Sequence, residues 1–419
     1  MKGRFAIIDV NPFVSRAALV EDGVLLDYAA DVVKEGKLLL NDIYLGKVER
    51  LVPALDGAFV NVGEKAVFLT SPSEKVKEGG FVIAQIVQEG FGTKEAKARE
   101  DIKITDYYLE YYPLRAFSVK ADGKAADKRG IIQASEKEGG WLVKETAENC
   151  DDETLKAEAA RLKEIYEAIV ENAAEREPKL LYSFGNKFKR FLAETSATAL
   201  ITNDEETANE YLSTYPTMEI TVNDLDEFGH LDEQIRSTFE REVPLPSKAN
   251  VVIEQTEACA VIDVNSGDCN VGNKTFNALK VNCEAAKEII KQLSLRNIAG
   301  SILVDFITLK SAENKKKVVS VLRESALKYP AAITVYDAFT RLGFVELTRK
   351  RERAQESAID LVPIWKLRAD LKALAIIKPK AVRISYPKET EINANWFLGF
   401  KFAVELIPAD SNDYVIQIL

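Results

Sequence analysis

The chain has 419 residues, of which 47% are apolar and 29% charged, a composition that is typical of a globular protein and excludes a disordered or fibrous one. At about 150 residues per domain, this length predicts about three domains. A net charge of −10 argues against nucleic-acid binding through bulk charge. A local basic groove is still compatible with that charge, because surface fields are screened within about 8–10 Å.

The reactive side chains narrow the classes of chemistry further. The four cysteines form no C-x-x-C pair, so we expect neither a disulfide scaffold nor a zinc ribbon. The single histidine, His230, excludes sites built from several histidines within one chain, so hydrolysis would depend on carboxylates, hydroxyls or lysines. Because we find neither the cleavage region of a signal peptide nor an apolar run of about 18 residues, we expect a cytoplasmic protein without a membrane span.

The first 90 residues are predicted to form short strands. An apolar run at 5–10 precedes a hairpin over 15–30, whose turn contains a glycine. From Asn41 to Gly90, short β segments alternate with turns, and Asp56-Gly57 occupies a hairpin position. Several short strands within about 65 residues suggest a small closed barrel of the OB type.

Helical periodicity appears in the middle of the chain. After mixed strand and loop over 106–140, apolar residues recur at spacings of three and four from Asp151 to Glu177, with Asp151 or Asp152 as the N-cap. We also expect a helix over 180–200.

From Val251 onwards, strands and helices alternate. We expect a strand pair over 251–265, an amphipathic helix over 275–297, and a buried strand over 301–307. A basic helix up to Leu327, a strand over 331–339 and a helix over 342–353 follow, which together predict a layered α/β domain. The last 55 or so residues are expected to form a small α/β or all-β appendix.

Two aspartates stand near the ends of apolar strands. Alternation places Asp263 and Asn265 on one face of their strand, opposite Ile262 and Val264. Asp305 interrupts an otherwise apolar strand, where a carboxylate is unfavourable unless it pairs or binds a cation. Two carboxylates and an amide oxygen suit Mg²⁺, which would activate water at neutral pH. The alternative is that Asp263 caps a turn and Asp305 pairs with a lysine.

Aromatic and basic residues could contact nucleic acid. Phe59 and Phe68 lie in the barrel segment, where exposed aromatics can stack on bases, although their spacing alone favours the barrel core. Basic clusters occur at 310–317 and 341–353, and the usual interpretation of such runs is a solvated face. We interpret Asp9, in the first strand, as structural, because no convincing second acid of a metal set follows it.

Three segments resemble the catalytic core of the ribonuclease E/G family in order and spacing: TEACAVIDVNSG, EAAKEIIKQLSLRNIAGSILVDFI and RLGFVELTRKR. Upstream, NDIYLGKVERLVPALDGAFVNVG resembles the S1 domain of that family, an OB barrel. The resemblance covers about residues 1–360 and implies an α/β multidomain fold. The implied parts are an RNase H-like subdomain (1–38 and 181–243), an S1 domain (39–105), a 5′-sensor-like region (106–180), a DNase I-like catalytic domain (244–360) and a small C-terminal domain (361–419).

The resemblance also implies a function. Members of the family are Mg²⁺-dependent endoribonucleases that hydrolyse phosphodiester bonds in single-stranded, A/U-rich RNA, in RNA processing or decay, and Mn²⁺ is an alternative ion. Asp263 and Asp305 match the metal-binding aspartates, and Asn265 matches the asparagine near them. The positions that match RNA-binding residues of the family are Phe59, Phe68 and Lys94 in the S1 domain, and Arg341, Arg349, Lys350 and Arg351 after the core.

The chain departs from the family pattern at two places. It lacks the C-P-x-C motif after the basic segment, so we expect no structural zinc and a homodimer, if formed, without a zinc bridge. The family's Arg-Thr pair for a 5′-phosphate is matched by Lys144 and Glu145, or by Thr146 after a one-residue slip, with Arg129 and Gly130 completing the pocket. A glutamate there would repel phosphate, so we expect weakened 5′-end sensing.

A second class of function fits the same residues. An RNA-binding protein without turnover could use the same barrel and groove, and cleavage of a labelled oligonucleotide would distinguish it from the nuclease. The acid pair favours the enzyme, because RNA binding alone does not require two carboxylates in a phosphate groove.

Overall fold

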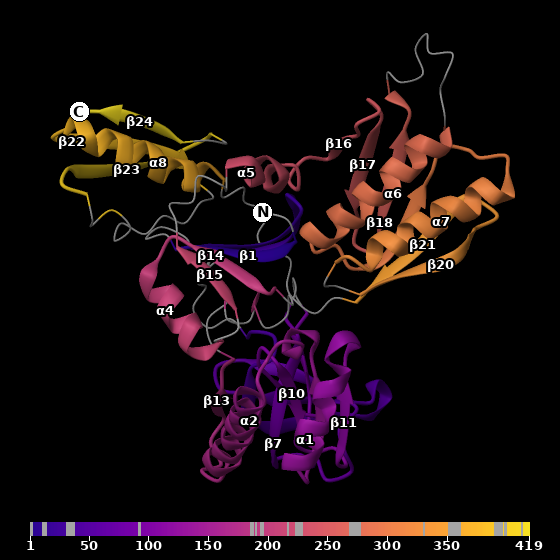
Figure 1. The fold of residues 1–419 in the computed structure, drawn as a ribbon, viewed down its shortest axis with the longest axis vertical. Helices are drawn as coiled ribbons and strands as arrows, with labels where there is room; N and C mark the ends of the chain where they lie inside the picture. The colour runs from indigo at the N-terminus through magenta and orange to yellow at the C-terminus, as the bar shows by residue number, and fades with distance from the viewer. Residues whose placement is uncertain are drawn as a thin grey trace.

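A computed structural model describes most of the chain, and its five β-sheets with their helices are drawn in Figure 1. Of the described helices, none is long and apolar enough to span a membrane. The described residues are 3–10, 15–30, 38–90, 94–184, 188, 191–192, 197–215, 218–222, 229–267, 278–329, 332–350, 362–388, 397, 400–411 and 414–419.

The N-terminal strands belong to a mixed sheet with the order β15-β14-β1-β2-β3, in which β1 is parallel to β14 and antiparallel to β2. The predicted hairpin of β2 and β3 is confirmed, and its turn places Asp22 and Gly23 at positive φ. The elements of this unit are β1 (Arg4–Asp9), β2 (Arg16–Glu21), β3 (Val24–Ala30), β14 (Ala199–Thr202), α4 (Glu205–Thr214), β15 (Glu219–Val222) and α5 (Gly229–Arg236).

Asp9 has a structural role in this sheet, as predicted. It is buried and forms an ion pair with Arg16, whose Nε lies 3.0 Å from Asp9 Oδ2. Arg16 Nη1 also contacts Asp232 Oδ1 on α5 at 2.6 Å, and Asn203 Nδ2 donates to Asp9 Oδ1 at 2.8 Å.

The predicted OB-type barrel is confirmed. Five strands pair in the order β4-β5-β6-β8-β7, and pairing of β4 with β7 closes the barrel around an apolar core. The helix that we expected over 180–200 is wrong at both ends, because Lys179–Tyr182 is strand β13, which pairs with β4, and 199–200 belong to β14. The barrel elements are β4 (Ile43–Val52), η1 (Pro53–Leu55), β5 (Gly57–Asn61), β6 (Ala66–Thr70), β7 (Phe81–Gln88) and β8 (Ala96–Arg99).

A small sheet with the order β11-β12-β10-β9 follows the barrel. The predicted helix is α2 (Asp152–Ala173), and the Asp151 side chain caps it by accepting from Thr154 N. The other elements are β9 (Ile104–Thr105), β10 (Leu109–Tyr112), β11 (Ser118–Ala121), η2 (Gly123–Lys128), α1 (Arg129–Ser135), β12 (Gly140–Val143) and η3 (Glu145–Ala147).

The predicted α/β layer is a six-stranded sheet with the order β16-β17-β18-β19-β21-β20, and the helices α6 and α7 pack on one of its faces. The helix that we expected over 342–353 is wrong for its first part, which is strand β21. Val345 and Leu347 are buried while Glu346 between them is exposed, so the period is two. The elements are β16 (Glu242–Pro244), β17 (Asn250–Gln255), β18 (Cys259–Asn265), α6 (Ala278–Leu295), β19 (Gly300–Asp305), α7 (Ala312–Ala326), β20 (Ile333–Phe339) and β21 (Phe344–Arg349).

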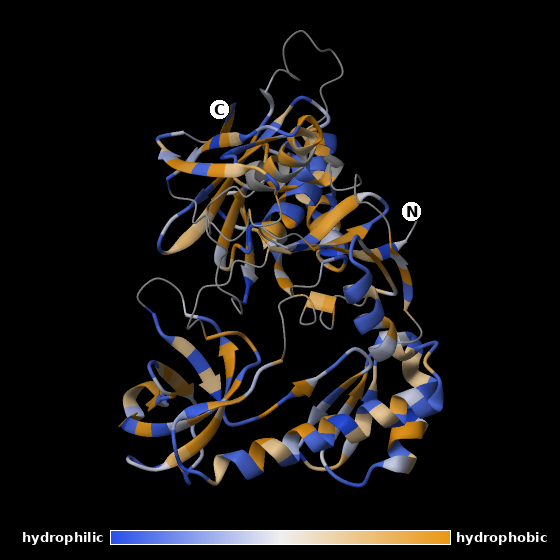
Figure 2. Ribbon diagram, turned by 90° about the vertical axis from the view of Figure 1, so that its left-hand side faces the viewer, coloured by the Kyte–Doolittle hydropathy of each residue, from blue (hydrophilic) through white to orange (hydrophobic). Residues whose placement is uncertain are grey.

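The C-terminal appendix is α/β and packs on the N-terminal sheet. Leu371 and Ile384 share an apolar cluster with Ile7 and Leu25. Figure 2 shows hydrophobic residues along the strands and hydrophilic ones recurring along the helices. The appendix contains α8 (Val362–Ile377), β22 (Ala381–Pro387), β23 (Ala403–Ala409) and β24 (Val415–Ile418).

Candidate active site

Asp263 and Asp305 are in-register partners on the neighbouring parallel strands β18 and β19. Such strands lie about 4.8 Å apart, and partners in register project from the same face of the sheet. Both aspartates are exposed, whereas Ile262 and Val304 point into the core beneath α6 and α7. Asp263 lies within β18 and does not cap a turn, and neither aspartate forms an ion pair with any described lysine or arginine. The structure therefore brings the two carboxylates together on the open face.

The electrostatics of this pair suit a cation. Although Asp305 is exposed, partial desolvation by its surroundings and, secondly, the carboxylate of Asp263 raise the pKa of Asp305 above its ordinary value. A divalent cation between the two groups would remove this repulsion. Mg²⁺ is commonly held by one or two carboxylates and keeps several waters. The donor set fits such an ion, and among the described residues no group of three or more His, Cys, Asp or Glu is arranged to hold a metal ion.

Two asparagines extend the acid pair along the sheet. Asn265 is exposed two residues beyond Asp263, on the same face. Its antiparallel partner on β17 is Asn250, whose Nδ2 donates to Glu242 Oε1 at 2.6 Å. Asn250 Oδ1 is buried and accepts no hydrogen bond from the described residues. Sequence reasoning missed Asn250, and the register of the β17–β18 hairpin is the signal that could have identified it.

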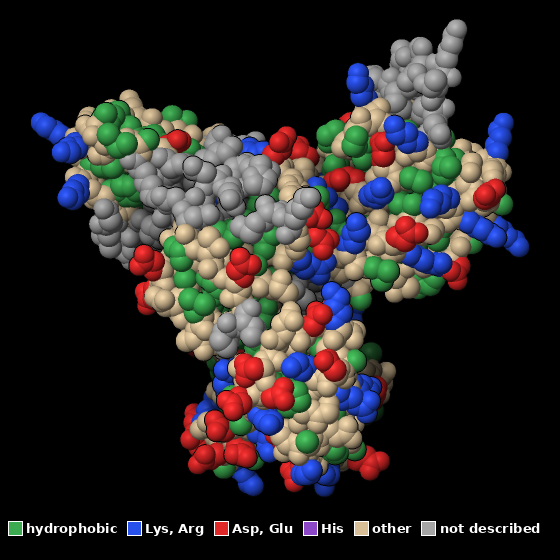
Figure 3. Space-filling model, in the orientation of Figure 1, with side chains coloured by type: hydrophobic (Ala, Val, Ile, Leu, Met, Phe, Trp, Pro, Cys, Tyr) green, Lys and Arg blue, Asp and Glu red, His purple; other side chains and the backbone are tan. Residues whose placement is uncertain are grey.

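Arg341 lies at the same end of the sheet as the acid pair. β21 begins with Phe344, which is the partner of Asp305. The turn over 340–343, which directly precedes Phe344, therefore lies at the end of the sheet that carries the carboxylates. Arg341 is exposed in this turn. Lys315 Nζ lies 5.2 Å from the ring centroid of Phe339, close to the same turn. Figure 3 shows further Lys and Arg side chains over α6 and α7.

Arg349 and Lys350 lie at the opposite end of β21, away from the carboxylates. Arg349 is the partner of Gly300, five positions before Asp305, which corresponds to about 17 Å along the strand. Its Nη1 donates to Asn297 Oδ1 at 2.7 Å and to the Ile298 carbonyl at 3.2 Å. The structure does not bring these two residues to the acid pair, and Arg351 lies outside the described residues.

Phe59 and Phe68 lie on the outside of the barrel, which excludes the interpretation that they fill its core. They are direct partners on β5 and β6, and their ring centroids are 5.4 Å apart in an edge-to-face arrangement. Their strand neighbours, such as Ala58 and Val67, point into the core. Gly57 makes room for Phe68, because a Cβ there would lie 2.2 Å from the ring.

Two cations complete a row across the outer barrel surface. Arg50 is the β4 partner of Phe59, and its Cζ lies 5.0 Å from the Phe59 ring centroid. Lys97 on β8 is the partner of Phe68 and is exposed. Lys94 is exposed three residues earlier in the chain. Sequence reasoning missed Arg50 and Lys97, because their place in the row depends on the strand pairing.

Two of the residues expected to bind a 5′-phosphate, Lys144 and Thr146, donate hydrogen bonds to backbone carbonyls. Lys144 Nζ donates to the Asp106 carbonyl at 2.8 Å, and the Thr146 hydroxyl donates to the Tyr107 carbonyl. Burial lowers the pKa of Lys144. Arg129 and Gly130 are exposed at the start of α1. The donors that would hold a phosphate on Lys144 and Thr146 are therefore engaged inside the fold.

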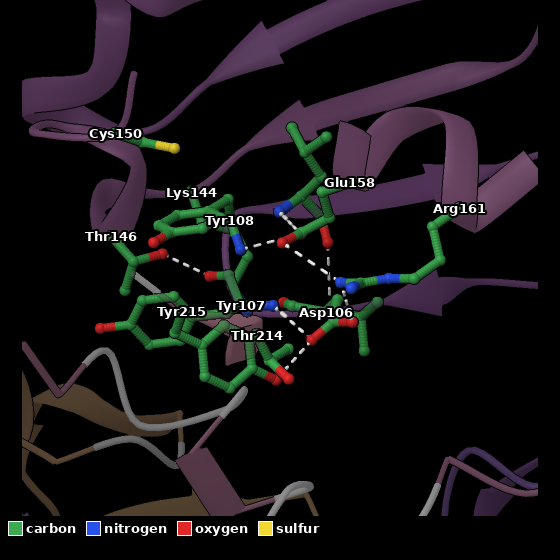
Figure 4. A network of polar contacts seen from close by, with 12 residues as sticks. Asp106, Tyr107, Tyr108, Lys144, Thr146, Cys150, Glu158, Arg161, Thr214 and Tyr215 are labelled. Carbon is green, nitrogen blue, oxygen red and sulfur yellow. Dashed lines mark hydrogen bonds and ion pairs between the residues drawn. The ribbon is translucent and has the colours of Figure 1, made fainter. Parts of the chain in front are cut away.

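Figure 4 shows a polar network beside Lys144. Asp106 Oδ2 accepts from Arg161 Nη2 on α2, and Asp106 Oδ1 accepts from the Tyr215 hydroxyl at the end of α4, both at 2.7 Å. Glu158 Oε1 accepts from the amides of Tyr108 and Leu109 at 2.9 and 2.8 Å. Burial, followed by the charge of Asp106, raises the pKa of Glu158 to about 8. The network joins the sheet of β9–β12 to α4.

Comparison with known proteins shows which family this chain belongs to. A model described as "Ribonuclease E/G family" matches residues 116–352, which is more than half of the chain and includes both aspartates. The chain belongs to the Ribonuclease E/G family. It is 27% identical to Ribonuclease G of Salmonella typhimurium over 83% of this chain and 80% of that protein. Identity to Ribonuclease G of Haemophilus influenzae is 28%, over 83% and 79% respectively. Ribonuclease E of Nostoc sp. is 31% identical, over 77% of this chain and 52% of that protein.

Membership of the Ribonuclease E/G family confirms the resemblance found in the sequence. The protein is an endoribonuclease involved in RNA processing or decay, and enzymes of this family depend on a metal ion. The acid pair on β18 and β19 provides oxygen ligands for such an ion, and the barrel carries the aromatic row described above.

Proposed function

We propose that this member of the Ribonuclease E/G family hydrolyses phosphodiester bonds in single-stranded, A/U-rich RNA of the cytoplasm with one Mg²⁺ ion held by Asp263 and Asp305. The observation that carries the proposal is the in-register pairing of these carboxylates on an exposed sheet face. Mn²⁺ prefers the same hard oxygen ligands and would also fit.

The chain's own residues have separate tasks in this reaction. A bound Mg²⁺ would supply a Lewis acid and lower the pKa of its water. Asn265 would orient the attacking water or one of the carboxylates. Water attacks the phosphorus, the bond from phosphorus to the 3′ oxygen breaks, and that oxygen takes up a proton. The products are a 5′-phosphate and a 3′-hydroxyl end.

The barrel would bind the unpaired strand. Phe59 and Phe68 present partly exposed rings on which bases can stack, and each stacked base contributes about 1–3 kcal/mol. Arg50 and Lys97 stand at the two ends of this row and would neutralise backbone phosphates, with Lys94 nearby. Stacking requires bases that are not paired, which supports a preference for A/U-rich segments, where stable duplexes are rare. Arg341 would contact a phosphate beside the acid pair.

We further propose the domain division that the resemblance implies. The sheet of β1–β3, β14 and β15 would be the RNase H-like subdomain, the barrel the S1 domain, and the sheet of β16–β21 the DNase I-like catalytic domain. The sheet of β9–β12 would be a 5′-sensor-like region in which sensing is weakened. A homodimer would form without a zinc bridge.

The test is cleavage of a labelled single-stranded A/U-rich oligonucleotide, with Mg²⁺ or with a chelator. We expect Mg²⁺-dependent cleavage by the native chain and its loss in Asp263→Asn and Asp305→Asn. Asp337→Asn is the control, because this exposed acid lies on β20, which β21 separates from β19, and pairs with Arg323. Cleavage that persists in both variants would reject the assigned site, and binding without cleavage by the native chain would favour a non-catalytic RNA-binding protein.

A further inference from the structure

Asn282 is fully buried on α6, and both the nitrogen and the oxygen of its side-chain amide form hydrogen bonds with the backbone of one residue, Ile307. Its Nδ2 donates to the Ile307 carbonyl at 2.7 Å, and its Oδ1 accepts from the Ile307 amide at 3.1 Å. The helix face around it is apolar, with Val281, Ala285 and Ala286 buried beside it. An apolar side chain would fit this face without the cost of burying an amide, so the polar residue has another role.

The position of Ile307 suggests that role. Asp305 is the last residue of β19, and its pairing with Asp263 and Phe344 is the last register of the strand. The chain then crosses from the sheet towards α7, and Ile307 is two residues into this crossing. The Asn282 amide therefore continues the hydrogen bonding of the strand beyond its end. It fixes the direction in which the backbone leaves Asp305.

We propose that Asn282 is a positioning residue that holds the Asp305 carboxylate in the orientation needed to share a cation with Asp263. The proposal rests on the function proposed above for the acid pair. Asn282 does not touch the reacting atoms, and it acts through the backbone of Ile307. Groups that orient metal ligands typically change metal affinity or activity by about 10- to 100-fold when they are removed.

The experiment compares Asn282→Leu with Gln292→Leu. Gln292 is also a fully buried amide on α6, but it bonds Ser237, Glu288 and Arg296 and lies ten residues further along the helix, about 15 Å away. Both variants lose the hydrogen bonds of a buried amide, so both should lower the unfolding temperature. Only Asn282→Leu should weaken Mg²⁺ binding, by about 10-fold, in a calorimetric titration with Mg²⁺ alone.

Two further readouts complete the test. The Mg²⁺ concentration for half-maximal cleavage should rise with Asn282→Leu, and hydrogen exchange at the Ile307 amide should accelerate. If Asn282→Leu does not fold, the smaller Asn282→Ala also removes both hydrogen bonds to Ile307 without adding a charge, and it should change Mg²⁺ affinity in the same direction. Equal Mg²⁺ affinity in the Asn282 variant and the Gln292 control would overturn the proposal. Unchanged Mg²⁺ binding in Asp305→Asn would instead overturn the proposed function.

Discussion

Asp263 and Asp305 face each other in register on two parallel strands, and the charge of the first helps to raise the pKa of the second. Partial desolvation is the larger cause of this shift. Two like charges are thus held side by side at the exposed end of the strands, which is unfavourable until a cation or a proton joins them. Because the register of the sheet brings the two carboxylates together, it also makes their binding of a metal ion depend on pH.

We expect Asp263→Asn to lower the pKa of Asp305 in the metal-free protein, because the variant removes the repulsion between the two groups. The pKa should stay above its ordinary value, since the partial desolvation is unchanged. A carboxyl carbon NMR titration measures it. In the native chain, Mg²⁺ affinity should fall as the pH falls through the raised pKa, since the proton competes with the cation. An unchanged pKa in the variant, or an equal shift in Asp337→Asn, would contradict this coupling.

Strand alternation explains why part of the site could be predicted from the sequence. Asp263 and Asn265 alternate with buried Ile262 and Val264, so their shared face follows from the period of two alone. That Asp305 lies beside Asp263 did not follow from the pattern of residues and was only implied by the resemblance to the ribonuclease E/G family. Asn250 and Asn282 could not be identified in this way, because their roles depend on strand register and on a contact between α6 and the end of β19.

The basic segment 341–353 shows that the role of a charged residue cannot be predicted from its position in the sequence alone. A helix was predicted over 342–353, whereas the alternation of buried Val345 and Leu347 with exposed Glu346 forms β21. Arg341 and Arg349 appeared equivalent as cations. The strand separates them, since one lies in the turn beside Asp305 and the other bonds Asn297 at the far end.

This separation predicts opposite phenotypes for two arginine substitutions. Arg349→Gln should lower the free energy of unfolding by about 1–3 kcal/mol, because it removes charged hydrogen bonds to Asn297 and to the Ile298 carbonyl. RNA affinity should not change. Arg341→Gln should weaken RNA binding and reduce the salt dependence by about 0.7 in log–log slope, with unchanged stability. Denaturant unfolding and RNA titration at several salt concentrations measure both, and reversed phenotypes would contradict the assignment.

The row of Arg50, Phe59, Phe68 and Lys97 on the outer surface of the barrel predicts how much each side chain contributes to the affinity for single-stranded RNA. Phe59→Ala and Phe68→Ala should each weaken binding by about 1–3 kcal/mol, since each removes a stacking surface. Lys97→Gln should mainly reduce the salt slope, by about 0.7. Phe81→Ala is the control, because Phe81 is an exposed aromatic on β7 outside the row. Fluorescence anisotropy with a labelled oligonucleotide measures each affinity, and an equal loss in Phe81→Ala would show that the row is not the binding surface.

Because 5′-end sensing is weakened, we expect a 5′-monophosphate substrate to be cleaved little faster than a 5′-hydroxyl substrate. Lys144 and Thr146 donate to the carbonyls of Asp106 and Tyr107, and Glu145 is exposed between them in the chain. Two oligonucleotides that differ only at the 5′ end give the comparison. A clear preference for the monophosphate, lost in Arg129→Gln, would show that the pocket is functional.

Glu158 gives a prediction for the pH dependence of local stability. Its pKa is raised from 4.5 to about 8, so between these values the folded chain holds a proton that the unfolded chain has released. The free energy of unfolding therefore falls as the pH rises through this window. Glu158→Gln cannot ionise and keeps an acceptor for the Tyr108 and Leu109 amides, so it should remove this part of the dependence. Hydrogen exchange at these two amides, corrected for the intrinsic rate, measures the effect at pH 5 and pH 8.

The control for Glu158 is Glu164→Gln, which removes an exposed carboxyl from the same helix. This variant should keep the pH dependence of the native chain at the Tyr108 and Leu109 amides. Burial and, secondly, the charge of Asp106 raise the pKa of Glu158, and Asp106 also accepts from Tyr215, so the loss of protection at high pH should extend to α4. Identical pH profiles for the native chain and Glu158→Gln would show that Glu158 is ionised throughout, with Arg161 as its counter-charge.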